Sequence, residues 1–423
     1  YNKIMMNLLT WLSRRRFPYE PLITVEISKS RLLSNLNEFR KIAPNGCIAP
    51  VLKSNAYGHG LVEVAEILES IKIPRPFGAP HFSKGDSVAI PFLVVDSYFE
   101  AIALRAKHIR TPILIIGYAR PETIAAARLK NISFTVTSME TLRALAKRAE
   151  IENTHGGMIS IQLPIVGARH PHRIHLKIDT GMRRQGIMPD EINNAIEIIQ
   201  GNQSIILEGI CSHLSDADNR DEAFTDSQII LWNKIVKQFR LKFPYLKYWH
   251  LSNTDGHRFH GEINGNVSRL GIGLYGLIND KSFTPALNLK PVLEMKTIIS
   301  GIKKLRVGDT VGYGNTFTAQ KNMTIATVPV GYFEGIDRRL SNRGIILVGP
   351  DKIPCPIIGR VSMNITTIDV SNVIGVNVGT AVTVISNDPN QANSIAKIAE
   401  KCNTITYEIA VKIPAQLKRA VID

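Results

Sequence analysis

Short apolar runs alternate with helical segments over more than half of the chain, and this alternation constrains the fold more than any other feature. The runs include PFLVVD (91–96), TPILIIG (111–117), RIHLKID (173–179) and SIILEGICSHL (204–214). Between them lie segments such as GLVEVAEILESI, in which Leu61, Val64 and Leu68 share one helical face. About eight such units fit between residues 47 and 277, which predicts a (β/α)8 barrel of the TIM type rather than an open sheet.

The pattern changes after about residue 290. Most later segments, such as MTIATVPVGY (323–332) and TAVTVIS (380–386), are strand-like and are separated by Gly, Asp and Asn turns. One segment, NQANSIAKIAEKCN (390–403), has the spacing of a helix. A chain of 423 residues is long enough for two domains. We therefore expect a barrel over residues 32–290 and a mostly β domain over residues 291–423.

Charge, apolar run length and cysteine spacing narrow the class of protein. The net charge of +15 would suit a nucleic acid or an anionic ligand. Because the Lys and Arg residues are scattered and no basic block exceeds Arg14–Arg16, we expect no nucleic-acid partner. No run of about 20 apolar residues occurs, so no transmembrane helix is predicted. The isolated cysteines favour reduced thiols and the cytoplasm; they are Cys47, Cys211, Cys355 and Cys402.

Two further segments are open to more than one interpretation. In residues 1–21 an apolar patch precedes Arg14–Arg16, the reverse of the order in a secretory signal. We interpret these residues as an N-terminal arm or a mis-set start, with membrane anchoring as the alternative. His170, His172 and His175 lie close together in RHPHRIH, but no Cys or acidic partner accompanies them. We expect a solvated loop there and no metal.

Lys53 is the first candidate for chemistry. It closes the apolar run CIAPVLK (47–53) and is followed at once by the turn sequence SNAYGHG. Barrel enzymes carry their catalytic groups at the C-terminal ends of strands. Desolvation there would lower the pKa of a lysine and favour a covalent bond to an aldehyde cofactor. An ordinary surface lysine would explain Lys53 taken alone.

The surrounding string VLKSNAYGHG resembles the motif of alanine racemases that carries the pyridoxal-phosphate lysine. Further motifs of that family follow in order: HLKIDTGMRRQGI (175–187), LEGICSHLSDAD (207–218), HLSNTDG (250–256), SRLGIGLYGL (268–277), VGYGNTF (311–317), GYFEGIDRR (331–339) and GRVSMN (359–364). The resemblance starts near Ile23. It implies a pyridoxal-phosphate-binding barrel and a β domain that also takes in the first strand (22–31). It also implies an isomerase that interconverts L- and D-alanine and supplies D-alanine for peptidoglycan.

The resemblance assigns two acid/base groups to opposite faces of the substrate, as racemisation requires. Lys53 would hold the cofactor and be one group; Tyr313, supplied by the partner subunit of a homodimer, would be the other. A tyrosine's ordinary pKa of about 10 is high for a base, and His213 would assist it by linking it to Arg269. Arg269 would face the pyridine nitrogen, and because a guanidinium keeps its proton, that nitrogen would stay unprotonated.

The remaining assignments also come from the resemblance. The cofactor phosphate would lie on Tyr57, Thr254 and the backbone amides of Gly271 and Ile272, with His250 stacked on the ring and Asn253 beside it. Arg184 would contact the substrate carboxylate. Lys177 matches a lysine that is carbamylated in many members. Lining the active-site entrance and the substrate site would be Asp218, Tyr332, Arg338 and Met363.

Simpler readings of these residues stay open. Tyr313 could be an aromatic side chain packed in the β domain, Arg269 could pair with a carboxylate, and Lys177 could be a plain lysine facing Asp179 or solvent. Asn364 stands where many members have aspartate, which leaves a broader amino-acid racemase as an alternative. The tyrosine that some members place near Ala415 is missing.

Two other classes of protein compete with a racemase. A barrel decarboxylase is expected to have a carboxylate toward the pyridine and a catalytic cysteine in the second domain, and here Arg269 replaces that carboxylate. A non-catalytic pyridoxal-phosphate-binding protein would lack the β domain and Tyr313.

Overall fold

The computed structural model describes residues 20–43, 47–71, 90–154, 171–219, 222–278, 283 and 286–423, with the backbone alone for residues 148–154. The expected arm, apart from residues 20 and 21, and His170 lie outside these ranges. The described chain forms two compact units. One comprises the residues up to Ile27 together with Leu293–Ile422, and the other comprises Ser28–Val292 and Asp423. No helix within the described ranges is both long enough and apolar enough to cross a membrane.

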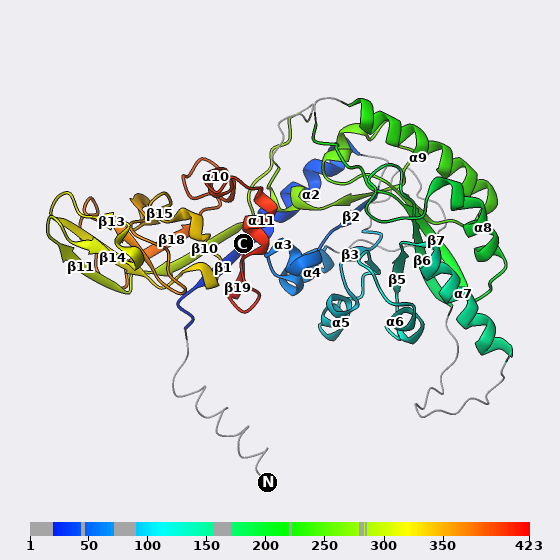
Figure 1. The fold of residues 1–423 in the computed structure, drawn as a ribbon, viewed down its shortest axis with the longest axis horizontal. Helices are drawn as coiled ribbons and strands as arrows, with labels where there is room; N and C mark the ends of the chain where they lie inside the picture. The colour runs from blue at the N-terminus through cyan, green and yellow to red at the C-terminus, as the bar shows by residue number, and fades with distance from the viewer. Residues whose placement is uncertain are drawn as a thin grey trace, which may run out of the picture. The chain divides into compact units, whose positions relative to one another are not determined.

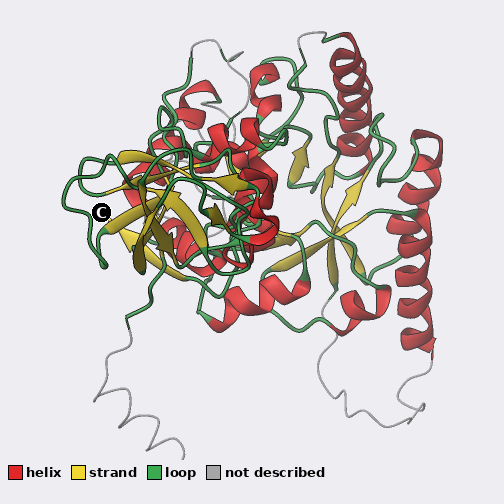
Figure 2. Cartoon of the chain, turned by 60° about the vertical axis from the view of Figure 1, so that its left-hand side comes forward, coloured by secondary structure: helices red, strands yellow, loops and turns green. Residues whose placement is uncertain are grey.

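The unit Ser28–Val292 is an α/β structure with parallel strands inside and helices outside (Figure 1, Figure 2). Six strands form a sheet in chain order: β3 (Leu93–Val95), β4 (Ile113–Ile115), β5 (Ile132–Val136), β6 (His172–Lys177), β7 (Ile205–Cys211) and β8 (Tyr248–His250). A separate parallel pair joins β2 (Cys47–Pro50) to β9 (Val267–Leu270). Every residue of β3, β4 and β5 is buried, as expected for strands covered on both faces.

Backbone hydrogen bonds connect the β2–β9 pair to both ends of the six-stranded sheet. Leu52 N donates to Val94 O at 2.7 Å, beside β3. At the other end Asn266 N donates to Trp249 O at 3.1 Å, and Arg269 N donates to Ser252 O at 3.0 Å, beside β8. The eight parallel strands are thus linked by hydrogen bonds from β2 round to β9.

With the exception of one left-handed turn, at residues 54–57, the helices of this unit follow local sequence rules. Their bounds are α2 (Lys29–Ile42), α3 (Lys53–Tyr57), α4 (Leu61–Glu69), α5 (Tyr98–Ala106), α6 (Pro121–Ala126), α7 (Met139–Thr154), α8 (Ile192–Gln200), α9 (Ala223–Lys242) and the 3-10 turns η1 (Pro189–Glu191), η2 (Asp255–Phe259) and η3 (Ile272–Tyr275). In α4 the predicted face is buried, including Leu61, Val64 and Leu68. Ser97 caps α5 by accepting from Glu100 N, and Pro121 occupies the first turn of α6 as predicted.

The other unit is rich in β-strands, which confirms the predicted change of pattern. Its six-stranded sheet has the order β16 (Ile353–Pro356), β15 (Ile345–Val348), β18 (Ala381–Ile385), β10 (Leu293–Ile298), β1 (Thr24–Ser28) and β19 (Lys418–Ile422). The first strand pairs with β10 in antiparallel register, Thr24 opposite Lys296 and Ile27 opposite Leu293. Smaller sheets contain β11 (Gly301–Leu305), β14 (Met323–Val328) and β17 (Thr366–Asp369), and β12 (Thr310–Val311) with β13 (Phe317–Thr318).

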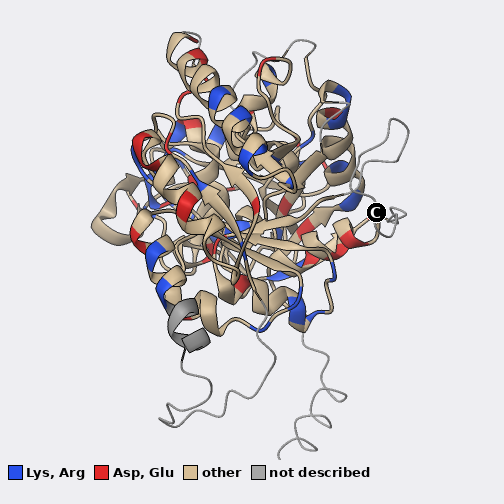
Figure 3. Ribbon diagram, turned by 90° about the vertical axis from the view of Figure 1, so that its right-hand side faces the viewer, with Lys and Arg blue, Asp and Glu red and all other residues tan. Residues whose placement is uncertain are grey.

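Short helical elements complete this unit: η4 (Tyr313–Asn315), η5 (Tyr332–Glu334), η6 (Arg338–Leu340), α10 (Ile395–Lys401) and α11 (Thr406–Val411). The sequence pattern predicted α10 but not α11, because six residues are too few to show a helical period. In the ribbon of Figure 3 the positions of Lys and Arg and those of Asp and Glu are interspersed along the chain.

Candidate active site

The backbone after Lys53 is unusual. Ser54, Asn55, Ala56 and Tyr57 all have positive φ, between 52° and 56°. Left-handed backbone costs a residue other than glycine roughly 1–2 kcal/mol, so the surroundings must hold this turn. Ala56 N donates to Leu52 O at 2.7 Å, and Glu100 accepts from Asn55 N at 3.2 Å. Strain of this kind is concentrated at functional sites, and the sequence pattern predicted only an ordinary turn here.

Lys53 lies in a partly buried environment that contains charges of both signs. Burial lowers the pKa of Lys53, and the positive charges of Arg184 and Arg269 act in the same direction. Asp96 and Glu100 oppose the shift by favouring the charged amine. A lowered pKa raises the fraction of neutral, nucleophilic amine. The reading of Lys53 as an ordinary surface lysine therefore does not fit the structure.

Arg269 is buried, and its guanidinium hydrogen bonds go to neutral acceptors. Its guanidinium donates to His250 Nδ1 at 2.5 Å, His250 O at 2.8 Å, Ser212 O at 2.7 Å, Leu251 O at 2.9 Å and His213 Nδ1 at 3.2 Å. Within the described residues none of these partners is a carboxylate, so the ion-pair reading of Arg269 is wrong. The guanidinium remains a cation without a counter-ion among these partners.

These hydrogen bonds fix which histidine nitrogens carry hydrogen. Because Arg269 is a donor only, Nδ1 of His250 and of His213 must accept, and each ring carries its hydrogen on Nε2. His250 Nε2 then donates to His175 Nδ1 at 2.8 Å. Burial, reinforced by the charge of Arg269, lowers the pKa of His213 and His250 well below the ordinary value, so both rings are neutral near pH 7. His213 Nε2–H remains a hydrogen-bond donor.

His175 shows how the structure corrects the sequence analysis. We expected a solvated loop at His170, His172 and His175, but His175 lies in β6 and is 1% exposed. Burial lowers its pKa to about 4. No group of three or more metal-ligand side chains is found within the described part of the chain. Sequence inspection did not identify His175 as a partner of His250, since the two lie 75 residues apart.

The predicted phosphate residues lie together. Thr254 Oγ1 accepts from two buried backbone amides, Gly271 N at 3.2 Å and Gly273 N at 3.3 Å. A Cβ atom at Gly271 would come within 2.8 Å of the Tyr57 hydroxyl and 3.6 Å of Thr254 Oγ1. Ile272 begins η3 and is buried. A side chain at position 271 would thus press on the Tyr57 hydroxyl, close to the Thr254 hydroxyl.

The other predicted residues of this unit differ in their surroundings. Asn253 accepts from Gly256 N at 2.8 Å and so shapes the turn that carries Thr254. Lys177 has its pKa lowered by burial first, and Arg269, Arg184 and Lys53 lower it further. Its amine donates to Gln185 at 3.4 Å, which is a long bond. Arg184 and Asp218 are exposed. The ring of His250 contacts those of Phe92 and His175.

Tyr313 belongs to the β-rich unit and is 72% exposed, so the reading of a packed aromatic side chain is wrong. Gly312 and Gly314 on either side have φ of 73° and 71°, values that a side chain would disfavour. The turn is held by its flanks, because Val311 and Phe317 pack in an apolar cluster with Met323. Tyr313 is therefore a side chain presented outward on a supported turn.

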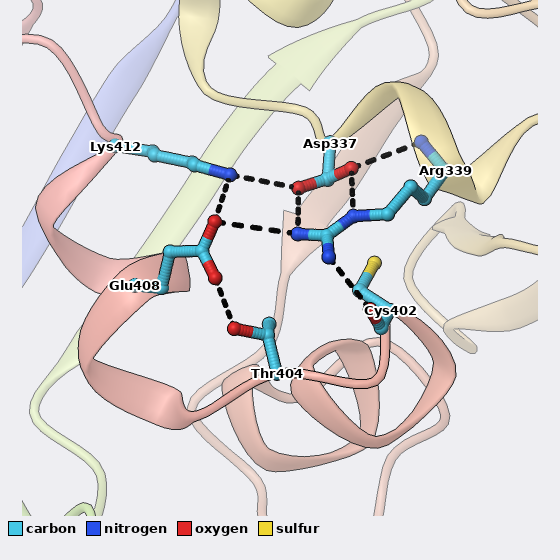
Figure 4. Close-up of polar contacts among 6 residues, drawn as sticks. All are labelled: Asp337, Arg339, Cys402, Thr404, Glu408 and Lys412. Atoms are coloured by element: carbon cyan, nitrogen blue, oxygen red, sulfur yellow. Dashed lines mark hydrogen bonds and ion pairs between the residues drawn. The ribbon is translucent and has the colours of Figure 1, made fainter.

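The predicted entrance residues of this unit are also exposed: Tyr332 at 44%, Met363 at 55%, and Arg338. Figure 4 shows what holds the turn that carries Arg338. Asp337 binds Arg339 in a two-pronged contact at 2.7 and 2.9 Å, and it also accepts from Lys412 at 3.0 Å. Lys412 in turn donates to Glu408 at 2.6 Å. This network fixes η6 to α11.

Comparison with known proteins completes the description of the site. The sequence-family model of the alanine racemase N-terminal domain matches residues 27–279, and that of the alanine racemase C-terminal domain matches residues 292–421. An alanine racemase of Lactobacillus acidophilus is 34% identical over 408 residues, which cover 95% of this chain and 98% of the relative.

Solved structures are similar over the same length. An alanine racemase of Clostridium difficile has a TM-score of 0.81 at 27% identity and covers 96% of both chains. A histidine racemase of Leuconostoc mesenteroides has a TM-score of 0.78 at 25% identity and covers 96% of this chain and 99% of that one.

Proposed function

The chain belongs to the alanine racemase family, and we propose that it interconverts L- and D-alanine with pyridoxal phosphate as its cofactor. The observation that carries this proposal is a partly buried amine, Lys53, within electrostatic reach of a buried cation, Arg269, whose hydrogen-bond partners among the described residues include no carboxylate. A decarboxylase of barrel type would be expected to present a carboxylate at that position. We further propose that the eight linked strands close as a (β/α)8 barrel and that the domains divide near residue 290.

The residues present fit an anionic, phosphorylated cofactor. Lys53, Lys177, Arg184 and Arg269 place four positive charges close enough to affect one another. At Gly271 two hydroxyls, of Tyr57 and Thr254, gather beside the backbone, and such donors suit a phosphate group. Residues that would hold the cofactor are Lys53, Tyr57, His213, His250, Asn253, Thr254, Arg269, Gly271 and Ile272. When bound, pyridoxal phosphate withdraws electrons from an attached amino acid and so acidifies its α-hydrogen.

The chain's own groups would then move the protons. Lys53, with its lowered pKa, would exchange a proton on one face of the substrate, and the Tyr313 hydroxyl on the other. His213 would donate its Nε2 hydrogen toward the tyrosine oxygen and so stabilise its deprotonated form. Arg269, held by neutral acceptors, would offer a hydrogen-bond donor to the pyridine nitrogen without protonating it. Arg184 would bind the substrate carboxylate.

We propose that a second copy of the chain completes each site. Support comes from Tyr313, which is exposed on its turn, and from other exposed apolar side chains of the same unit: Tyr332, Phe333, Met363 and Ile365. Exposed apolar side chains that gather in one place often mark a surface that another protein covers. In this arrangement the tyrosine of one subunit would serve the lysine of its partner, and the protein would be a homodimer.

Mixing two inactive variants tests the shared site. Lys53→Ala and Tyr313→Phe should each lose at least about 100-fold in racemisation of alanine. If the sites are shared, subunit exchange between them restores about a quarter of wild-type activity, because half of the random dimers contain one intact site of two. A mixture that stays inactive although sedimentation shows exchanged dimers would contradict sharing. Full activity in both single variants would refute the two-base mechanism. A wild-type protein that binds pyridoxal phosphate but does not racemise alanine would leave a non-catalytic cofactor-binding protein as the better reading.

A broader amino-acid racemase is the second candidate. The similarity to a histidine racemase structure favours it, as does the departure from the family pattern at Asn364. Turnover of the enantiomers of alanine, serine, lysine, arginine and histidine distinguishes the two. For an alanine racemase we propose a cytoplasmic location and D-alanine for peptidoglycan as the product's use; the free, buried cysteines are compatible with a reducing compartment.

A further inference from the structure

Glu334 and Asn364 form a carboxylate–amide pair in the β-rich unit. Asn364 Nδ2 donates to one oxygen of Glu334 at 2.7 Å, and the backbone amide of Gly331 donates to the other at 2.8 Å. Glu334 is 8% exposed. A buried carboxylate needs such donors, and with both oxygens engaged its side chain has one orientation.

The pair lies where two chain segments meet. Tyr332 N donates to Ser362 O at 3.0 Å, and Phe333 N donates to Met363 O at 2.9 Å. At Gly331 a Cβ atom would come within 2.2 Å of Ser362 O, so the two backbones are in direct contact. The bond between Asn364 and Glu334 adds a side-chain link to these backbone links. Residues 331–334 and 362–364 are therefore held as one body.

Each segment presents an exposed side chain at its outer side, Tyr332 and Met363. We propose that the Glu334–Asn364 pair is a positioning device that fixes Tyr332 and Met363 relative to each other and thereby sets the affinity for the amino-acid substrate. This inference rests on the proposed function, in which these two side chains line the entrance. Glu334 and Asn364 act through Tyr332 and Met363 and are not catalytic residues.

In this chain the amide at position 364 supplies the hydrogen that the Glu334 carboxylate accepts. An aspartate there would bring two carboxylates to within about 3 Å of each other, and like charges at that distance must share a proton or separate. The charged side chains that follow Glu334 in the chain, Asp337 and Arg339, bind each other and pair with Lys412 and Glu408 (Figure 4). Because Asn364 is itself exposed, an aspartate there separates by turning away from Glu334 into solvent, and the side-chain link between the two segments is lost.

The test uses Asn364→Asp, the double variant Glu334→Gln/Asn364→Asp, and a control. In the double variant the amide stands at position 334 and the carboxylate at position 364, so the hydrogen bond and the charge balance are kept. Asn364→Asp should raise KM for alanine about tenfold with a smaller change in kcat, and the increase should grow as the pH rises and the shared proton is lost. The double variant should return KM to within about twofold of wild type. The control Asn372→Asp makes the same chemical change at an exposed turn and should leave KM unchanged.

Two outcomes overturn the proposal. One is an unchanged KM in folded Asn364→Asp. The other is a KM raised equally in the single and double variants, since Asn364 would then act by itself. If Asn364→Asp does not fold, a folded double variant with wild-type KM supports the pair, and a double variant that fails to fold or has a raised KM overturns it. A wild-type protein that does not racemise alanine refutes the proposed function alone, and the pair is then tested by thermal melting. The pair is supported if the melting temperature of Asn364→Asp decreases with rising pH while that of the double variant does not. It is refuted if the two variants behave alike.

Discussion

Acid should destabilise this protein through its buried histidines, and His257 isolates the effect. Its ring is 2% exposed and lies edge-on to Phe39, with centroids 4.9 Å apart. Nδ1 donates to the carbonyl oxygens of Asn253 at 2.9 Å and Thr254 at 3.2 Å. Burial lowers the pKa of His257 from 6.5 to about 4, although the two backbone hydrogen bonds oppose this.

The sign and size of the effect follow from these values. Between pH 6.5 and about pH 4 the ring takes up a proton in the unfolded chain but not in the folded one, so the free energy of unfolding falls as the pH falls. One proton over one pH unit is worth about 1.4 kcal/mol, which makes the interval worth about 3 kcal/mol. Burial also lowers the pKa of His175 to about 4 and contributes a similar amount. The two losses together are comparable to the lower end of the free energy of unfolding of a typical domain, roughly 5–15 kcal/mol.

Urea denaturation of wild type and His257→Asn at several pH values measures the effect. The asparagine amide replaces the Nδ1 donor but binds no proton. Near pH 7 the variant should be less stable by about 1–2 kcal/mol, because the ring contact with Phe39 is lost. The two curves of unfolding free energy against pH should then converge and cross between about pH 6 and pH 4. The exposed His108, changed to Asn, is the matched control and should keep the wild-type slope. Parallel curves for wild type and His257→Asn would refute the reasoning.

Three further predictions concern the site and its support. Gly271→Ala should weaken pyridoxal phosphate binding about 10- to 100-fold, because the added Cβ displaces the Tyr57 hydroxyl; absorbance titration of the apoprotein checks this, and unchanged affinity would exclude a tight phosphate cradle. Asp337→Asn should lower the free energy of unfolding by about 1–3 kcal/mol near pH 7. The bonds to Arg339 and Lys412 lower the pKa of the Asp337 carboxyl far below the ordinary range. The loss of stability in the variant should therefore persist in mild acid and shrink only at strongly acidic pH. Thermal melting at a series of pH values measures this. Burial lowers the pKa of Lys177, and we expect its amine to bind carbon dioxide as a carbamate. In the presence of 13C-bicarbonate the wild type should give a carbonyl NMR signal that is absent in Lys177→Ala. Identical spectra of the two proteins would contradict the carbamate.

The sequence by itself determined the parts of this protein that depend on local pattern. The alternation of apolar runs and amphipathic segments predicted the parallel strands and helices. The spacing of apolar residues along the chain indicates which strand or helix face is buried. The position of Lys53 at the end of a strand, and the order of motifs around it, predicted the family that the comparisons show.

The tertiary structure alone decided the contacts between residues far apart in the chain. His175 meets His250 across 75 residues, and Asn364 meets Glu334 across 30. Sequence spacing also did not reveal the left-handed turn after Lys53, which is held by Leu52 and Glu100. The environment of a side chain depends on every element folded around it. For this reason the sequence could identify Arg269 as a candidate, but only the fold shows that it is a buried cation held by neutral acceptors.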